Sequence, residues 1–311
     1  MLGSRGSELA LAQTKLVEQA LRKAWPSLEI SVEIIRTSGD EKSARVTDRK
    51  AGRKGLFTRE IEQELLVRRI DLAVHSAKDL PSEKLEELEI AATLPRANVE
   101  DVLLTRISGG LAAIAAGGVI GTGSIRRQRQ LAWKRPDLVA VDLRGNVPTR
   151  LRKLDQNIDW SGIILARAGL ERLGLEVVGR ALRLPNGPGQ PERSPYNAEI
   201  LSPDDFVPAG GQGIIALQVR RDDERVRRLV QPVDDPSTHI CLTAEREFLR
   251  LLNGDCDSPV GVHAIVTDGT LRLHAQVFED HTPSPRMGEV TGATTEPGAL
   301  AAALRAQLYG N

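Results

Sequence analysis

The sequence predicts an α/β protein with more than one domain and a smaller α+β unit at its C-terminal end. The chain has 311 residues, more than a single hydrophobic core usually supports, so two or three domains are expected. Helical periods alternate with short apolar runs over most of the chain, as they do in α/β folds. After about Pro232 the order becomes a helix, two short strands and a last helix, which is typical of an α+β unit.

Local signals place the individual elements. Ser7 is suited to cap a helix that runs to about Trp25 and ends at Pro26. Proline, glycine, serine and asparagine are frequent in residues 184–204, which predicts an exposed loop or a connection between domains. The other expected elements are strands at 28–36, 70–76, 162–166 and 213–219, helices at 58–69 and 243–252, and a turn between two strands at 267–270.

Composition narrows the possible functions. Basic and acidic residues both number 42, so the formal charge is zero, and aromatic residues are few; nucleic-acid binding is therefore disfavoured. No apolar run has the roughly 20 residues of a membrane span, and the N-terminus has no secretory segment, so a cytoplasmic protein without a membrane partner is expected. The two cysteines, Cys241 and Cys256, form no CxxC pair, and the histidines form no HExxH motif, so no metal site is predicted.

The stretch 121–154 holds two arginine-rich loops and is the most informative part of the chain. Each loop follows a short apolar run and precedes a helical pattern, so free backbone N–H groups and the helix dipole face the same place as the arginines. Guanidinium groups suit carboxylates and phosphates. The candidate anion ligands are Arg126, Arg127, Arg144 and Arg150. The other basic residues fit a solvated helix face better: Arg129, Lys134, Arg135, Arg152 and Lys153.

Six segments, in order along nearly the whole chain, resemble the porphobilinogen deaminase family: HSAKDLP, GTGSIRRQRQL, LRGNVPTRLRKLD, ILARAGLERLGL, PAGGQG and NGDCDSPVGVHA. The resemblance implies two periplasmic-binding-protein-like α/β domains around an active cleft, a smaller α+β C-terminal domain, and a monomer. It places domain 1 at 1–97 plus 207–228, domain 2 at 98–206 and domain 3 at 229–311.

The activity that the resemblance implies is the head-to-tail joining of four porphobilinogen molecules. Each addition releases ammonia, and hydrolysis then frees the linear tetrapyrrole hydroxymethylbilane. The family carries a dipyrromethane cofactor, and the match places its covalent attachment at Cys256. Every pyrrole ring bears an acetate and a propionate, so a growing chain needs several carboxylate clamps, which the two arginine loops would supply. No metal or nucleotide is implied.

The resemblance makes Asp79 the principal catalytic residue. It follows the strand at 70–76, where ligands of open α/β sheets gather, and a carboxylate there would stabilise the positive charge that develops as ammonia departs. On sequence alone, a turn-capping role fits equally well. Cys256 is flanked by two aspartates that disfavour a thiolate, although a thioether formed once during maturation needs no lowered pKa. Cys241 matches no family site and is expected in the core.

The resemblance assigns the other site residues by their positions. Ser7 also fits a plain helix cap, Lys50 and Lys54 also fit a solvated loop, and Gln212 is expected only to shape the hinge. The expected cofactor contacts are Lys78, Ser76, Thr122, Ser124, Arg126, Arg127, Arg144 and Lys54, and the expected substrate contacts are Arg5, Ser7, Gln13, Arg150, Arg172 and Lys50.

The chain departs from the family pattern in four places. The first strand is short, Gly123 stands where serine is common, Asp255 stands where glycine is common, and a Pro/Gly-rich insertion occupies 186–199. Two rival functions stay open on the residues alone. A two-lobed carrier of a small anion needs neither Cys256 nor Asp79, and a thiol-dependent acyltransferase would use Cys256 but lacks a recognisable histidine signature.

Overall fold

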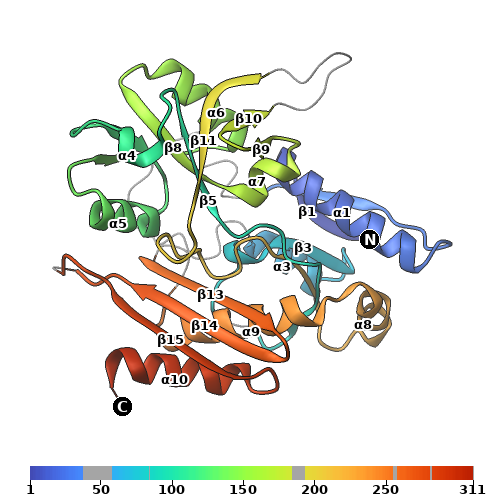
Figure 1. Cartoon of the computed structure of the whole chain (residues 1–311). Helices are drawn as coiled ribbons and strands as arrows, with labels where there is room; N and C mark the ends of the chain where they lie inside the picture. Colours follow the sequence, from blue (N-terminus) through green and yellow to red (C-terminus); the bar gives the residue numbers. More distant parts are fainter. Residues whose placement is uncertain (38–57, 84, 184–192, 255–257, 281, 311) are drawn as a thin grey trace.

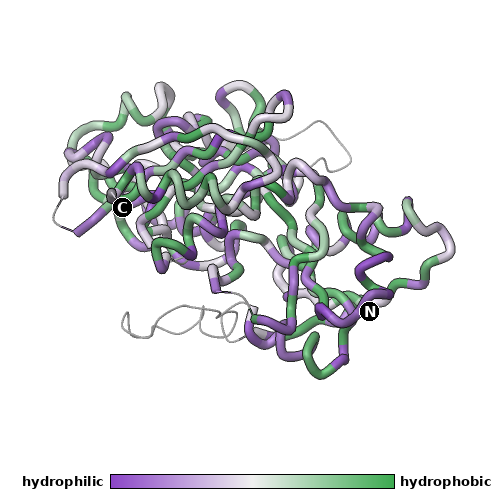
Figure 2. The backbone as a smooth tube through the Cα atoms, turned by 90° about the horizontal axis from the view of Figure 1, so that it is seen from below, coloured by the Kyte–Doolittle hydropathy of each residue, from purple (hydrophilic) through white to green (hydrophobic). Residues whose placement is uncertain are grey.

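The computed structural model describes residues 1–311 except 38–57, 84, 184–192, 255–257, 281 and 311. Three separate sheets organise the described part of the chain, with five, seven and three strands. Figure 1 shows the second sheet with its helices above, the N-terminal elements beside it, and the third sheet with the C-terminal helix below. The termini lie far apart in the view of Figure 2.

The first sheet has the strand order β2-β1-β3-β12-β4. Strand β1 runs parallel to β2 and β3, whereas β12 arrives from far along the chain and runs antiparallel to β3 and β4. Although β1 is only four residues long, all four pair with β2, so the short first strand is integrated in the sheet. The elements are β1 (Leu2–Arg5), α1 (Glu8–Ala24), β2 (Val32–Ile35), α3 (Arg59–Leu66), β3 (Leu72–Ser76), η1 (Ala77–Asp79), β4 (Leu88–Thr93), β12 (Ile215–Arg220), α8 (Glu224–Val230) and η2 (Gln231–Val233).

The second sheet has the order β7-β6-β8-β5-β11-β10-β9. Strand β6 is parallel to both β7 and β8, so the two arginine loops that follow β6 and β7 open at the same edge. The elements are β5 (Asp101–Thr105), α4 (Gly110–Ala113), β6 (Val119–Gly121), α5 (Ile125–Lys134), β7 (Val139–Val141), α6 (Val147–Gln156), β8 (Trp160–Ala166), α7 (Arg167–Arg172), β9 (Glu176–Val178), β10 (Ala181–Arg183) and β11 (Arg193–Leu201).

Strand β11 shows that the prediction of a loop over residues 184–204 was wrong for residues 193–201. The strand pairs with β5 from Asn197 to Leu201 and with β10 on its other side. Its Tyr196 and Ala198 are buried at alternate positions, which is the period of a strand. The many turn-forming residues suggested a loop, but pairing with two neighbouring strands and burial of alternate side chains outweigh that local preference. Residues 184–192 lie outside the described residues.

The third sheet is an antiparallel meander, β13 (Val260–Thr267), β14 (Thr270–Val277) and β15 (Arg286–Ala293), joined by a turn at the expected place. The helices α9 (Pro236–Leu251) and α10 (Pro297–Tyr309) pack on it around the fully buried Phe248. Helix α9 begins before the expected 243 because Asp235 caps it by accepting from Thr238 N, and Pro236 suits the first turn.

Two crossings join the first and second sheets. One runs from the end of β4 to Asp101 at the start of β5, and the other runs from the end of β11 to the start of β12. They lie side by side, since Ala97 N donates to Gly213 O at 3.1 Å. The predicted class, two α/β lobes with a smaller α+β unit, is confirmed. The strands of each sheet fall within the expected domain ranges, and the boundaries themselves stay a prediction.

Candidate active site

Asp79 ends the 3-10 turn η1, directly after the central strand β3 of the first sheet. A hydrogen bond from Ala77 N to Ile214 O (3.0 Å) fixes this turn. Gly211 approaches it so closely that a Cβ there would lie 2.9 Å from Ala77 C, and its φ of +77° also favours glycine. The Asp79 side chain is 33% exposed, and its Oδ2 lies 4.0 Å from Arg5 Nη1. The carboxylate therefore faces a cation at the open end of the strand.

Lys78, in the same turn, carries a perturbed amino group. Burial lowers the pKa of Lys78 to about 8; the neighbouring Asp79 opposes this shift, while Arg127 and Arg150 lower the pKa further. The last two residues belong to the second lobe, so charges from both lobes act on this amino group. Lys78 is positively charged at neutral pH and loses its proton in mildly alkaline solution.

The start of α1 supplies a polar wall beside this turn. Ser7 caps the helix by accepting from Ala10 N at 3.3 Å, as its sequence context predicted. One turn further along, the buried amide of Gln13 lies 2.8 Å from the hydroxyl of Ser76 at the end of β3. The structure thus brings together Arg5, Ser76 and Gln13 near Asp79, whereas the hydroxyl of Ser7 is occupied by its capping bond.

In the first arginine loop, the two adjacent arginines of α5 are buried and share one carboxylate. Arg126 Nη2 donates to Asp101 Oδ2 at 2.9 Å and Arg127 Nη2 donates to Asp101 Oδ1 at 2.7 Å. Burial of Asp101 raises its pKa, but the charges of Arg126 and Arg127 outweigh that effect and hold the pKa well below its usual range. The buried Nε atoms of both arginines have no hydrogen-bond partner within the described part of the chain. These N–H groups are donors suited to an anionic ligand.

The hydroxyl residues that precede these arginines shape the loop. Thr122 is buried, and its Oγ1 accepts from Ser124 N at 3.3 Å, while the Ser124 side chain is half-buried. A Cβ at Gly123 would lie 2.6 Å from Leu143 O, in the second arginine loop. Glycine at this position therefore accompanies a close approach of the two loops, so the missing family serine is explained by packing in this chain.

The second arginine loop contributes side chains that face the first loop. Arg144 Nε donates to Asp142 Oδ2 at 2.7 Å, and Arg150 Nε donates to Gly145 O at 2.7 Å. Burial lowers the pKa of Arg150 to about 10, and Arg127 lowers it further, while Asp79 opposes the shift. Arg150 therefore lies within electrostatic reach of both Asp79 and Arg127. This agrees with the parallel pairing of β6 and β7, which places the two loops at one edge of the sheet.

Arg172 has a different position from the other arginines. It ends α7, and its Nη2 donates to Gly213 O at 2.7 Å, on the crossing that returns to the first sheet. Burial lowers the pKa of Arg172 to about 10. The guanidinium is already hydrogen-bonded to the backbone between the lobes, so any role in ligand binding would use its other N–H groups.

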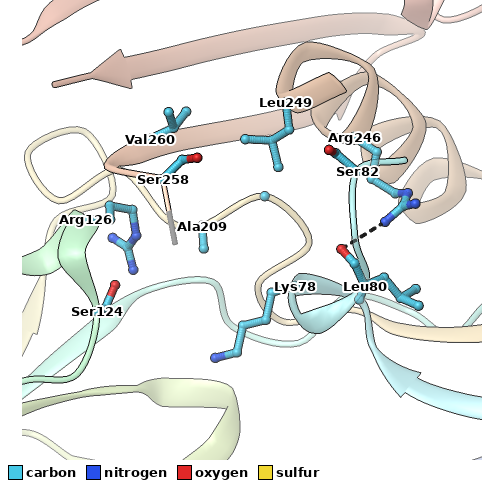
Figure 3. A pocket seen from close by; sticks show the side chains of 12 residues that line it. Lys78, Leu80, Ser82, Ser124, Arg126, Ala209, Arg246, Leu249, Ser258 and Val260 are labelled. Carbon is cyan, nitrogen blue, oxygen red and sulfur yellow. Dashed lines mark hydrogen bonds between the residues drawn. The ribbon is translucent and has the colours of Figure 1, made fainter. Parts of the chain in front are cut away.

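A narrow cavity lies where the three parts of the molecule meet (Figure 3). Counted with its opening to solvent, the empty space here is about 490 Å³, and little of it is enclosed by protein. Lys78 comes to it from the first lobe, Ser124 and Arg126 from the second, and Ser258 from the segment that precedes β13. The sequence reasoning missed Arg246 of α9, which also lines this cavity and donates to Pro81 O at 2.8 Å.

Three predicted site residues, Cys256, Lys50 and Lys54, lie outside the described residues. Cys241 is buried in the C-terminal core, as expected, and burial raises its pKa to about 11, with Glu245 adding to the shift. In the described ranges, no group of three or more histidine, cysteine or acidic side chains is arranged to hold a metal ion. Of the described helices, none combines the length and the apolar character needed to cross a bilayer.

These residues fit a dipyrromethane. Its acetate and propionate groups require cationic donors, and Arg126 and Arg127 offer buried Nε–H groups that have no partner among the described residues. Lys78 and Ser124 add donors at the cavity that Arg126 lines, and Ser258, which also lines it, is the first described residue after the segment that contains Cys256. Fold and site together define a two-lobed α/β protein with a cavity lined by cationic side chains, to which a third, α+β unit also contributes.

Comparison with known proteins identifies the group within this class. The model of the porphobilinogen deaminase dipyrromethane cofactor binding domain matches residues 1–228, and the model of the porphobilinogen deaminase C-terminal domain matches residues 239–310. The chain belongs to the porphobilinogen deaminase family. Relatives named porphobilinogen deaminase include those of Syntrophobacter fumaroxidans, 45% identical over 89% of this chain and 83% of the relative, and Roseiflexus sp., 42% identical over 99% and 95%.

Solved structures give a weaker comparison. An arginine-specific periplasmic binding protein of Salmonella typhimurium is 15% identical, with 73% of this chain and 82% of that chain covered and a TM-score of 0.37. This score is too low to define the fold, which rests on the sheets described above.

Proposed function

We propose that this chain catalyses the head-to-tail polymerisation of four porphobilinogen molecules to hydroxymethylbilane, with a dipyrromethane cofactor, in tetrapyrrole biosynthesis. The observation that carries the proposal is one carboxylate, Asp79, set among cationic side chains from both lobes, in a chain of this family. Arg5 lies 4.0 Å from it, and Lys78 and Arg150 are electrostatically coupled to it.

The cationic groups account for binding. Each substrate ring carries two carboxylates, and several arginines in fixed positions can each hold one by paired N–H donors. The excess of positive side chains also raises the local concentration of an anionic substrate in the cleft. A carboxylate in such surroundings weakens anion binding, so the position of Asp79 at the open end of β3 points to a role in the reaction.

That role is stabilisation of developing positive charge. When the C–N bond of the aminomethyl group breaks, ammonia leaves with the bonding electrons, and the remaining carbon and pyrrole nitrogen share a positive charge. The Asp79 carboxylate offsets this charge and can accept a hydrogen bond from the pyrrole N–H. The free α-carbon of the last ring of the chain then forms a carbon–carbon bond to this cationic carbon, and the same α-carbon loses its proton. The cofactor supplies the pyrrole ring on which the chain starts.

The remaining roles follow the family pattern and the contacts described above. Cys256 is the proposed attachment residue. We assign cofactor contacts to Lys78, Ser76, Thr122, Ser124, Arg126, Arg127, Arg144 and Lys54, and substrate contacts to Arg5, Ser7, Gln13, Arg150, Arg172 and Lys50. The hydroxyl of Ser7 caps α1, so its contact with substrate would be an additional hydrogen bond. A monomeric state and a cytoplasmic location, both expected from the sequence, stay predictions that sedimentation and cell fractionation would test.

The experiment that tests this function measures two products together. Purified protein is mixed with porphobilinogen, and released ammonia is followed beside a linear tetrapyrrole that cyclises and oxidises to an absorbing porphyrin. One ammonia for each porphobilinogen consumed is expected. Binding of porphobilinogen without ammonia release would contradict the proposal and favour the anion carrier, whereas transfer of an acyl group to a thiol would favour the acyltransferase.

A further inference from the structure

A single buried carboxylate, Asp101, connects the cleft arginines to the crossings between the lobes. It is the first residue of β5, and its side chain is fully buried. Besides the hydrogen bonds from Arg126 and Arg127, its Oδ1 accepts from Gln212 Nε2 at 2.8 Å. Gln212 lies on the returning crossing, and the same Nε2 donates to Val99 O, on the outgoing crossing, at 2.6 Å.

The orientation of the two arginines requires an explanation. Adjacent residues of a helix project about 100° apart, yet Arg126 and Arg127 converge on one carboxylate. Other hydrogen bonds fix their remaining terminal nitrogens: Arg126 Nη1 donates to Val207 O at 2.7 Å, and Arg127 Nη1 donates to Ile164 O at 3.1 Å. Within the described ranges, Nε is the one side-chain nitrogen of each arginine that is buried and has no hydrogen-bond partner.

The charge balance of this cluster also bears on the role of Asp101. Two guanidinium groups and one carboxylate together have a net charge of about +1, which attracts a carboxylate ligand. Asp101 also avoids the cost of burying two cations without a counter-charge. Without Asp101, the two cations would repel each other, and their terminal nitrogens would compete for whatever acceptor enters. The ligand would then have to supply the order that the protein now provides.

We propose that Asp101 is a positioning residue: it orients Arg126 and Arg127 so that their Nε–H groups face the ligand. Through its hydrogen bond with Gln212, Asp101 also connects the two arginines to the crossings between the lobes. The effect on turnover rests on the proposed function, whereas the orientation itself does not. Asp101 touches neither substrate nor cofactor in this scheme, and it acts only through the two arginines.

The test compares Asp101→Asn with a control that breaks an arginine–aspartate pair elsewhere, Asp223→Asn. Asp223 accepts from Arg220 at 2.5 Å in the first lobe and has no contact with the arginine loops. The first readout is the ¹⁵Nε–¹Hε NMR signals of Arg126 and Arg127, assigned by single Lys substitutions. In the parent protein and in D223N, both signals should be sharp and slow to exchange; in D101N, they should broaden or be lost.

The second readout is kinetic. D101N is expected to lower kcat/KM for porphobilinogen by about 100-fold, mainly through KM, because misplacing binding groups by about 1 Å costs that much. D223N should change kcat/KM by less than about 3-fold while lowering Tm. In an Arg127→Gln background, D101N should lower kcat/KM by less than about a further 5-fold, since Asp101 acts through that arginine. Intact mass gives the fraction of each variant that carries the cofactor, and D101N alone should have a lowered fraction.

Asp101→Glu keeps the proposal testable if D101N does not fold. It preserves the charge but moves it by one methylene, so the Tm should stay within a few degrees of the parent while KM rises. Unchanged Nε–H signals and KM in D101N or D101E, with only a loss of Tm like that of D223N, would overturn the proposal. A parent protein without porphobilinogen turnover would refute the proposed function, and the NMR comparison would still decide the orientation.

Discussion

Replacing Asp79 by Asn changes the charge of the candidate active site with almost no change of shape. A cation at the distance where Arg5 now lies, 4.0 Å from the carboxylate, is stabilised by about 1 kcal/mol in bulk water and about 4 kcal/mol at an effective dielectric constant of about 20. Asp79 is one-third exposed, and a bound ligand will reduce the exposure of the cleft further. We therefore expect the Asn variant to lose electrostatic stabilisation close to the upper value. This corresponds to a fall in kcat of about 100- to 1000-fold.

The assay is the rate of ammonia release at saturating porphobilinogen, with intact mass confirming that the variant carries its cofactor. Asp268→Asn is the control, because it makes the same chemical change in the exposed β13–β14 turn, where asparagine tolerates the φ of +50°. A cofactor-loaded D79N enzyme within about 3-fold of the parent kcat would refute the electrostatic role and leave Asp79 as a residue of the turn.

Three further predictions concern binding, chain growth and stability. Raising the pH through about 8 removes the proton of Lys78, so the KM for porphobilinogen should rise there. Lys78→Arg should abolish this alkaline rise because a guanidinium stays protonated, and an unchanged pH profile in the variant would show that Lys78 is not the group responsible. Arg127→Leu should block cofactor assembly or the first additions, whereas Arg172→Leu should stall later intermediates in native mass spectra; identical species in both would refute stage-specific binding. Phe248→Ala should lower the free energy of unfolding in urea by about 3–5 kcal/mol, and a loss below about 1 kcal/mol would show that the core around it rearranges.

The sequence predicted elements whose signals are local. The first helix was placed because a capping serine, an apolar face and a following proline all lie within one segment, and the structure has that helix with Ser7 as its cap. Strand β11 was missed because its stability comes from pairing with β5 and β10, which are distant in sequence. Its alternating Tyr196 and Ala198 were the available signal.

The same limit applied to the site. The arginine loops were found because strand, turn and helix signals adjoin the arginines, but the common partner of Arg126 and Arg127 was not. Asp101 lies 25 residues before Arg126, and only the fold brings it beneath α5. An aspartate at the start of an otherwise apolar strand, DVLLT, was a weak sign of a buried ion pair. Arg246 gave no such sign, since it reads as an ordinary helix residue.

The intact mass of the purified, active protein tests the central claim most directly. The account predicts a mass above that of the printed sequence by two linked pyrrole units, and a peptide carrying them that contains Cys256. The Cys256→Ser variant should have the bare mass and no turnover, while Cys241→Ser, in the core, should keep both the added mass and the activity. Active protein with the mass of the bare sequence would contradict the account.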